Sequence, residues 1–202
     1  MLVNISSNQI WLSTHWQARR TYGNIEQQFP QILSQVAKKY PPKQIFVINW
    51  PWSFTNLRLG ALTINLLKWL NPAIQLFWLS KPNFFKNVLK QVPQLPPRWV
   101  FFIWQKKRGW LYHLPSDTKD FFPYEKIPQL AQEVFFDQTF EFSPYIPKPK
   151  MVNFHYIEGN SLFFDFDSSY HQVDLSQMPW QKTDFLVPNY MLAPSISQPN
   201  PQ

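Results

Sequence analysis

The stretch Gln-Ile-Phe-Val-Ile-Asn-Trp-Pro-Trp-Ser-Phe-Thr-Asn-Leu-Arg-Leu-Gly, residues 44–60, followed by the apolar run 61–70, decides the fold. Its first part, Ile45–Ile48, is a short continuous apolar run, which is typical of a strand covered on both faces. Asn49 and Pro51 end this strand, because proline has no N–H to donate to a sheet and biases its preceding residue away from helix.

A helix is predicted directly after the strand. Ser53 or Thr55 can cap its first turn, since a hydroxyl oxygen accepts from the free N–H groups there. The apolar pattern continues to Leu70 and is ended by Asn71-Pro72. A buried strand, a tight loop and a buried helix form half of an α/β unit, so the sequence predicts an α/β fold.

This helix is apolar nearly all round. At about 100° per residue, one side carries Phe54, Leu57, Ala61 and Ile64. The opposite side carries Leu59, Leu62, Leu66, Trp69 and Leu70. One side can pack on its own sheet, and the other must be covered by more of this chain or by another protein. Lys68 and Asn65 interrupt a segment that would need about 20 apolar residues to span a membrane.

The loop at residues 49–60 is similar to the Gly-Pro-Gly-Ser-Phe-Thr-Gly-Leu-Arg-hydrophobic-Gly signature of the TsaB family. The positions that match the signature are Ser53, Phe54, Thr55, Leu57, Arg58 and Gly60. Three glycines of the pattern are replaced, two of them by Trp52 and Asn56. TsaB proteins are glycoprotease (peptidase M22-like) relatives and the catalytically silent paralogues of TsaD.

The resemblance implies a fold and a function. The fold would be the actin-like ATPase (ASKHA, ribonuclease H-like) α/β fold with two small lobes, the second reduced. The lobes would span residues 1–97 and 98–193, with a tail at 194–202. The function would be that of a non-catalytic scaffold paired with TsaD, in the complex that makes threonylcarbamoyladenosine next to the anticodon of tRNA. The TsaE ATPase would be a further partner, and tRNA an indirect one.

A second helix is predicted over Ile25–Tyr40, with Asn24 as its cap and Pro41-Pro42 as its end. Its apolar residues recur at helical spacing and form one stripe. In the TsaB family this helix and the one after the Ser-Phe-Thr loop form the surface that binds TsaD. The resemblance therefore implies an interface at Phe29, Ile32, Leu33, Val36, Leu57, Ala61 and Ile64. Packing of both helices on the chain's own sheet is the alternative.

Further elements frame these two helices. Short strands are predicted over Leu2–Ile5, Gln9–Leu12 and Ala73–Leu79, followed by a helix over Phe84–Val92. Hairpins are predicted over 99–114 and 152–166, because each pair of apolar runs is joined by a short connection with a glycine. A short helix is predicted over Ile127–Phe136.

Several chemistries are disfavoured by composition. The chain has no cysteine and four glycines, none of which lie close together, so a glycine loop that cradles phosphates is not expected. We therefore expect no ATP or other cofactor, and the resemblance to a catalytically silent family implies that there are no catalytic residues. Asn4 stands where the TsaB family has an aspartate, which removes a candidate metal ligand. The four histidines lack the spacing of a helical metal pair.

The formal net charge is +7, which favours contact with polyanions such as tRNA. Candidate RNA contacts are Lys106, Lys107 and Arg108 at the tip of the first hairpin. A stand-alone basic RNA-binding module is thus the alternative function. The start of the chain lacks the pattern of a signal peptide, so a cytoplasmic location is expected.

A third reading comes from Asp165-Phe-Asp167-Ser168, which resembles the start of haloacid-dehalogenase phosphatases. In those enzymes the first aspartate is a nucleophile and the second an acid. The match lacks the following glycine, and too few residues follow it for the rest of that fold. Alternating acids on the exposed face of a strand explain the pattern better.

Overall fold

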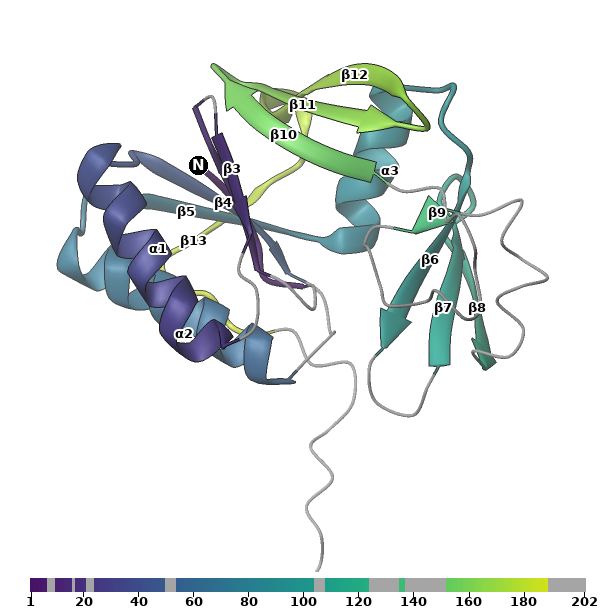
Figure 1. Ribbon diagram of the computed structural model, residues 1–202. Coiled ribbons are helices and arrows are strands. Elements are labelled where there is room, and N and C mark those ends of the chain that lie inside the picture. The colour runs from purple at the N-terminus through teal and green to yellow at the C-terminus, as the bar shows by residue number, and fades with distance from the viewer. Residues whose placement is uncertain are drawn as a thin grey trace, which may run out of the picture.

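The computed structural model describes residues 1–6, 10–15, 17–20, 24–49, 54–103, 108–123, 135–136 and 152–188 (Figure 1). Within them the chain is a mixed α/β protein with three sheets. Its α-helices are α1 (Ile25–Lys39), α2 (Phe54–Leu70) and α3 (Lys81–Gln91). The predicted α/β class is therefore confirmed.

The largest sheet has six strands in the order β13-β5-β4-β1-β2-β3. Its strands are β1 (Leu2–Asn4), β2 (Trp11–Thr14), β3 (Gln17–Arg20), β4 (Gln44–Asn49), β5 (Gln75–Ser80) and β13 (Gln181–Thr183). β1, β4 and β5 run parallel, whereas β2, β3 and β13 are antiparallel to their neighbours. The strands predicted near the N-terminus and before and after α2 are all present.

The two faces of this sheet are covered by different layers, as β4 shows. Ile45 and Val47 belong to the core beneath α1 and α2, whereas Phe46 and Ile48 belong to the core on the other face. That second core is completed by α3 and by the sheet above it (Figure 1). The prediction that Ile45–Ile48 is a strand covered on both faces is confirmed.

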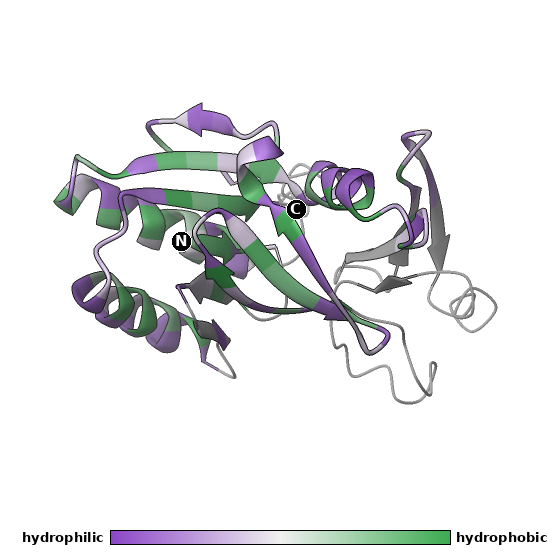
Figure 2. Cartoon of the chain, turned by 90° about the horizontal axis from the view of Figure 1, so that it is seen from above, coloured by the Kyte–Doolittle hydropathy of each residue, from purple (hydrophilic) through white to green (hydrophobic). Residues whose placement is uncertain are grey.

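The helix α1 is amphipathic. Asn24 caps it, because its Oδ1 accepts a hydrogen bond from the Gln27 N–H at 3.3 Å. Phe29, Leu33 and Val36 are buried against the sheet. Apolar and polar residues alternate along the helix ribbons when the protein is seen from above (Figure 2).

A three-stranded antiparallel sheet lies above the six-stranded one. It consists of β10 (Val152–Glu158), β11 (Ser161–Phe166) and β12 (Ser169–Asp174), followed by a short 3-10 helix at Leu175–Gln177. Gly159 has a φ of 57° in the first turn, which is the left-handed region that glycine adopts freely. The predicted second hairpin is confirmed.

The third sheet has the order β8-β7-β6-β9. Its strands are β6 (Arg98–Ile103), β7 (Arg108–His113), β8 (Thr118–Pro123) and β9 (Phe135–Phe136). The predicted first hairpin is confirmed by the antiparallel pairing of β6 with β7. The helix predicted over Ile127–Phe136 is wrong at its end, because Phe135 and Phe136 pair in parallel with β6. The remainder of that prediction lies outside the described residues.

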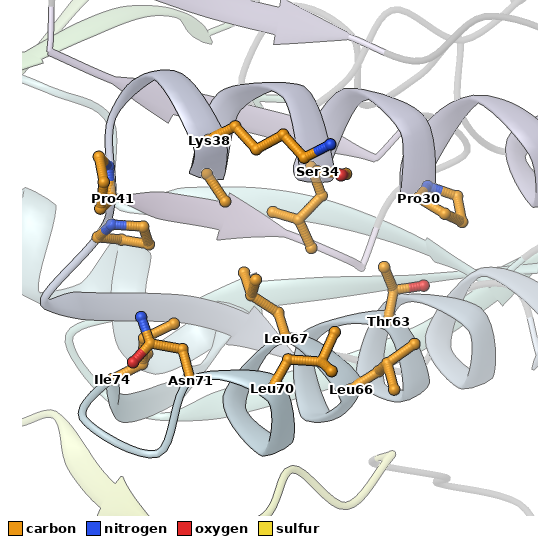
Figure 3. A pocket seen from close by; sticks show the side chains of 13 residues that line it. Pro30, Ser34, Lys38, Pro41, Thr63, Leu66, Leu67, Leu70, Asn71 and Ile74 are labelled. Carbon is orange, nitrogen blue, oxygen red and sulfur yellow. The ribbon is translucent and has the colours of Figure 1, made fainter.

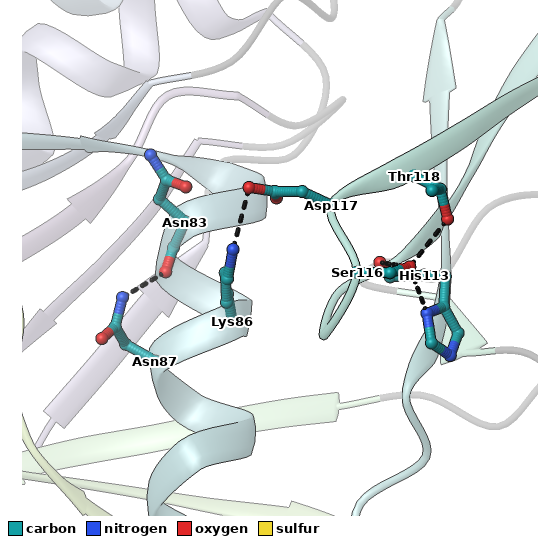
Figure 4. Close-up of polar contacts among 7 residues, drawn as sticks. All are labelled: Asn83, Lys86, Asn87, His113, Ser116, Asp117 and Thr118. Carbon is teal, nitrogen blue, oxygen red and sulfur yellow. Dashed lines mark hydrogen bonds and ion pairs between the residues drawn. The ribbon is translucent and has the colours of Figure 1, made fainter.

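An aromatic contact and an ion pair connect the third sheet to α3. The rings of Phe85 and Trp99 stack with centroids 4.3 Å apart. The Lys86 Nζ lies 2.8 Å from the Asp117 Oδ2, in the turn between β7 and β8 (Figure 4). Burial, and to a smaller extent the charge of Asp117, raise the pKa of Tyr112 to about 12.

Residues on both sides of the predicted lobe boundary at residue 97 belong to one buried cluster. Trp99 and Phe154, which follow the boundary, share one buried cluster with Leu2 and Ile48. β13 returns to the six-stranded sheet and pairs with β5. The second half of the chain therefore completes the core of the first half.

Candidate partner-binding site

The outward face of α2 carries large apolar side chains that the described part of the chain leaves exposed. Trp69 is 75% exposed and Leu62 is 66% exposed, and Leu66 and Leu70 are also exposed. We call these four residues the outer α2 face. They recur at helical spacing, so they form one strip rather than scattered single residues. A strip of this kind is a feature of interaction surfaces.

The seven residues predicted as the interface lie elsewhere. Six of them are buried in the core between the helices and the sheet: Phe29, Leu33, Val36, Leu57, Ala61 and Ile64. Ile32 is half-buried and packs against the same core. A side chain inside the core presents no surface to a partner, so the choice of face is corrected. The helices were chosen from the resemblance, but the structure turns their other side outward.

A groove runs between α1 and α2 beside the outer α2 face. Figure 3 shows Leu66, Leu67 and Leu70 of α2 facing Ser34 and Lys38 of α1 across it. Its volume is about 440 Å³, and its lining is almost entirely apolar. The groove is continuous with the exposed strip, because Leu66 and Leu70 belong to both. It can accept an apolar side chain of a partner.

The segment after β13 extends the apolar surface. Phe185 and Val187 are exposed, whereas Leu186 between them is buried in the core. Phe185 borders a second hollow of about 630 Å³ together with Leu62 and Pro188. The exposed apolar surface therefore continues from α2 onto this segment.

Two buried asparagines hold that segment in place. The Asn65 side chain donates to the Leu186 carbonyl at 3.0 Å and accepts from the Leu186 N–H at 2.8 Å. The Asn49 Nδ2 donates to the Val187 carbonyl at 2.9 Å. Asn65, which interrupts the apolar pattern of α2, and Asn49 at the end of β4 thus position the segment, which the sequence did not reveal.

Replacing Asn65 by alanine is expected to loosen this segment. The change leaves the N–H and C=O of Leu186 without these partners, at a cost of about 1–3 kcal/mol for a buried polar group. Hydrogen exchange at Leu186 should accelerate, and the free energy of unfolding should fall. Asn65→Asp is the matched control, since it can still accept from the Leu186 N–H but cannot donate. Unchanged exchange in both variants would contradict this role.

The residues of the Ser-Phe-Thr loop motif lie in different environments. Ser53 lies outside the described residues, and Phe54 begins α2. Thr55 and Arg58 are exposed on the first turns, whereas Leu57 is buried. Gly60 lies against Ile5, so its part in the motif is a close approach of helix and sheet.

The carboxyl end of β1 was considered for metal chemistry. The Asn4 Oδ1 accepts hydrogen bonds from the Ser6 N–H at 3.0 Å and from the Ser6 hydroxyl at 2.5 Å. The ammonium group of Lys81, which is fully buried, donates to the Ser6 carbonyl at 2.5 Å. These contacts tie β1 to the start of α3. In the part of the chain that is described, no three His, Asp or Glu residues are grouped to hold a metal.

The other candidate residues are placed as follows. Lys106 and Lys107 lie outside the described residues, and Arg108 begins β7. Asp165 is on the outer side of β11, where its Oδ1 lies 3.0 Å from the His155 Nε2. Asp167 lies in the following turn with a φ of 45°. The alternation had suggested that both aspartates lie on the exposed face of one strand. Only Asp165 does, because Asp167 lies in the turn.

No helix among the described segments is both long enough and apolar enough to cross a membrane.

Comparisons with known proteins give a distant likeness. No family model matches the chain, and no curated protein matches it. YeaZ from Pseudomonas aeruginosa, a TsaB homologue, is 13% identical with a TM-score of 0.44, over 74% of this chain and 81% of that chain. A second structure, an uncharacterized protein with similarity to peptidase YEAZ from Pseudomonas aeruginosa, is 12% identical with a TM-score of 0.42. It covers 77% of this chain and 83% of that chain. The chain is thus similar, at low identity, to solved structures of the TsaB type.

Proposed function

We propose that this chain is a non-catalytic subunit that binds a protein partner through the outer α2 face. The observation that carries the proposal is the strip of large apolar side chains that α2 turns away from its own core. Burying one such side chain contributes about 1.5–3 kcal/mol. Leaving several of them in water is costly unless a partner covers them.

The composition of the strip also fits an interface. Tryptophan is enriched among residues that dominate binding energy, and Trp69 is the most exposed large apolar residue of α2. The groove between α1 and α2 provides a cavity beside it. Phe185 and Val187 enlarge the apolar area on the other side. A partner that covers this surface would meet a central ridge and a neighbouring hollow.

The partner we propose is a TsaD-like protein, and the fold we propose is the actin-like one. Support comes from the loop signature, in which Thr55, Leu57, Arg58 and Gly60 fall on the first two turns of α2. The helix that carries the signature is the helix that carries the exposed strip. On this proposal the chain supports threonylcarbamoyladenosine formation in tRNA, in a complex that includes the TsaE ATPase. It contacts tRNA only indirectly.

Replacing Trp69 by aspartate is expected to weaken the complex with the TsaD protein from the same genome strongly. The change places a charge where an apolar side chain is buried in the complex, and hot-spot residues of this kind contribute at least about 2 kcal/mol. Affinity should therefore fall by about thirtyfold or more, since 1.4 kcal/mol is a factor of ten. Size-exclusion chromatography with light scattering, on the separate and mixed proteins, measures the loss.

The matched control is Asn83→Asp, which adds the same charge at an exposed position of α3. It should bind as the unaltered protein does. A complex that survives Trp69→Asp would remove the outer α2 face from the interface. The unaltered protein could instead remain a monomer when mixed with the TsaD protein and bind tRNA in a strongly salt-dependent way. That result would favour the basic RNA-binding module and contradict the proposal.

A further inference from the structure

The upper sheet of β10, β11 and β12 has a charge opposite to that of the whole protein. Residues 152–174 contain four acids and no lysine or arginine, although the formal net charge of the chain is +7. The acids are Glu158, Asp165, Asp167 and Asp174. Such separation of charge creates a local negative field on an otherwise basic protein.

The same sheet presents a row of aromatic rings on its outer side. The rings of Tyr156 and Phe163 stack with centroids 4.8 Å apart, and those of Phe163 and Tyr170 with centroids 5.9 Å apart. His155 stacks on Tyr170 at 5.8 Å. All three pairs have interplanar angles of 25°, so the rings lie nearly parallel across the three strands.

This row is not part of the core. The residues of the sheet that face the core are Phe154, Leu162, Phe164 and Val173, all of them buried. They alternate along the strands with the residues of the row, as expected for a sheet with one face inward. Tyr170 is 57% exposed, and Phe163 and Tyr156 are half-buried. Tyr170 is therefore the ring of the row that is most accessible to a ligand.

The aromatic row carries polar groups and lies in the field of nearby carboxylates. The Tyr170 hydroxyl donates to the Tyr156 hydroxyl at 3.1 Å. This hydrogen bond, followed by smaller contributions that include the charges of Asp165 and Glu158, raises the pKa of Tyr170 to about 12. The negative field of the acids thus reaches the most exposed ring.

We propose that this aromatic and acidic face binds an arginine-bearing segment of a protein partner. A guanidinium group can stack on the exposed Tyr170 ring while it forms an ion pair with the carboxylate of Asp165 or Glu158. Arginine fits better than lysine, because its planar group both stacks and forms two hydrogen bonds at once. Single-stranded RNA would also stack on such rings, but its phosphates would be repelled by acids with no lysine or arginine among them.

The aromatic and acidic face of β10–β12 is separate from the outer α2 face. The β10–β12 sheet and the helices α1 and α2 lie on opposite faces of the six-stranded sheet (Figure 1). A partner on α2 and an arginine-bearing segment on the upper sheet can therefore be bound separately or together.

The test uses the full chain and a peptide of four Gly-Arg repeats, with Gly-Lys and Gly-Ser repeats as comparison peptides. Titration calorimetry at low salt should show binding of the Gly-Arg peptide, weaker binding of the Gly-Lys peptide and none of the Gly-Ser peptide. Tyr170→Ala should weaken Gly-Arg binding by about threefold or more, which is the factor expected from one exposed cation–π contact. Binding should weaken further as salt is raised.

Asp165→Asn is expected to weaken the same binding by a similar factor. Its matched control is Asp120→Asn, which removes an equal charge from the exposed side of β8 in another sheet. Circular dichroism confirms that each variant is folded. Equal binding in Tyr170→Ala, or equal losses in the Asp165 and Asp120 variants, would overturn the proposal. Tight binding of single-stranded RNA that Tyr170→Ala abolishes would also overturn it.

Discussion

Ile64→Asp is expected to unfold the protein, whereas Leu66→Asp, two residues further along the same helix, is expected to leave it folded. Ile64 is fully buried in the core between α2 and the sheet. Truncation of a buried isoleucine alone costs about 2–5 kcal/mol, and a buried carboxylate without a partner adds to that cost. The combined cost is comparable with the whole free energy of unfolding of a typical domain, which is about 5–15 kcal/mol.

The comparison of these two variants distinguishes the faces of α2. Leu66 lies on the outer α2 face, so an aspartate there stays in water and costs little. Thermal unfolding followed by circular dichroism measures both effects. If Ile64→Asp were folded and lost only its partner, the interface first suggested by the resemblance would be restored. If Leu66→Asp unfolded, the outer face would be part of a core.

The sequence predicted the central unit well, because its signals are local and agree with one another. The run Ile45–Ile48 and the helix up to Leu70 are bounded by prolines and asparagines, which act within a few residues. The stripe of the helix over Ile25–Tyr40 has a clear period, and Asn24 caps it as predicted. In such segments the period of the apolar residues and the boundary residues are enough to predict the element and its ends.

The sequence was least informative where pairing is non-local. β13 lies far along the chain from the other strands of the six-stranded sheet, yet it pairs with β5 at the edge of that sheet. Nothing in Gln181–Thr183 specifies that edge. Phe135 and Phe136 fit a helical pattern, but their pairing with β6 decides their conformation. β3 was not predicted, because Gln17–Arg20 has no apolar alternation.

The candidate site shows the same division. The sequence established that α2 is apolar on both sides and that one side must be covered by something beyond its own sheet. It could not decide which side packs inward, since both sides have similar hydrophobicity. The sheet decided this, because Leu57, Ala61 and Ile64 fit against its strands. Trp69 and Leu62 consequently face out.

Gly60→Ala is expected to lower the stability of the protein, although alanine is the better helix former. A Cβ atom at Gly60 would lie 2.5 Å from the Cγ2 and 2.8 Å from the Cβ of Ile5, closer than real carbon atoms approach. Ile5 is fully buried and β-branched, so it cannot rotate away cheaply. Overpacking of this kind costs about 1–3 kcal/mol, against about 1 kcal/mol gained in helix propensity.

The clash is isolated by combining Gly60→Ala with Ile5→Ala, because the second change removes the nearest carbon. In a thermal or denaturant unfolding series, Gly60→Ala should cost less in the Ile5→Ala background than in the unaltered protein, which measures their coupling. Gly159→Ala is the control glycine: its strain comes from a φ of 57° with open space around it, and Ile5→Ala should not relieve it. Equal costs of Gly60→Ala in both backgrounds would show that α2 shifts away from β1 instead. A shift of that kind would also move the outer α2 face, so partner binding measured on the same variants would report it.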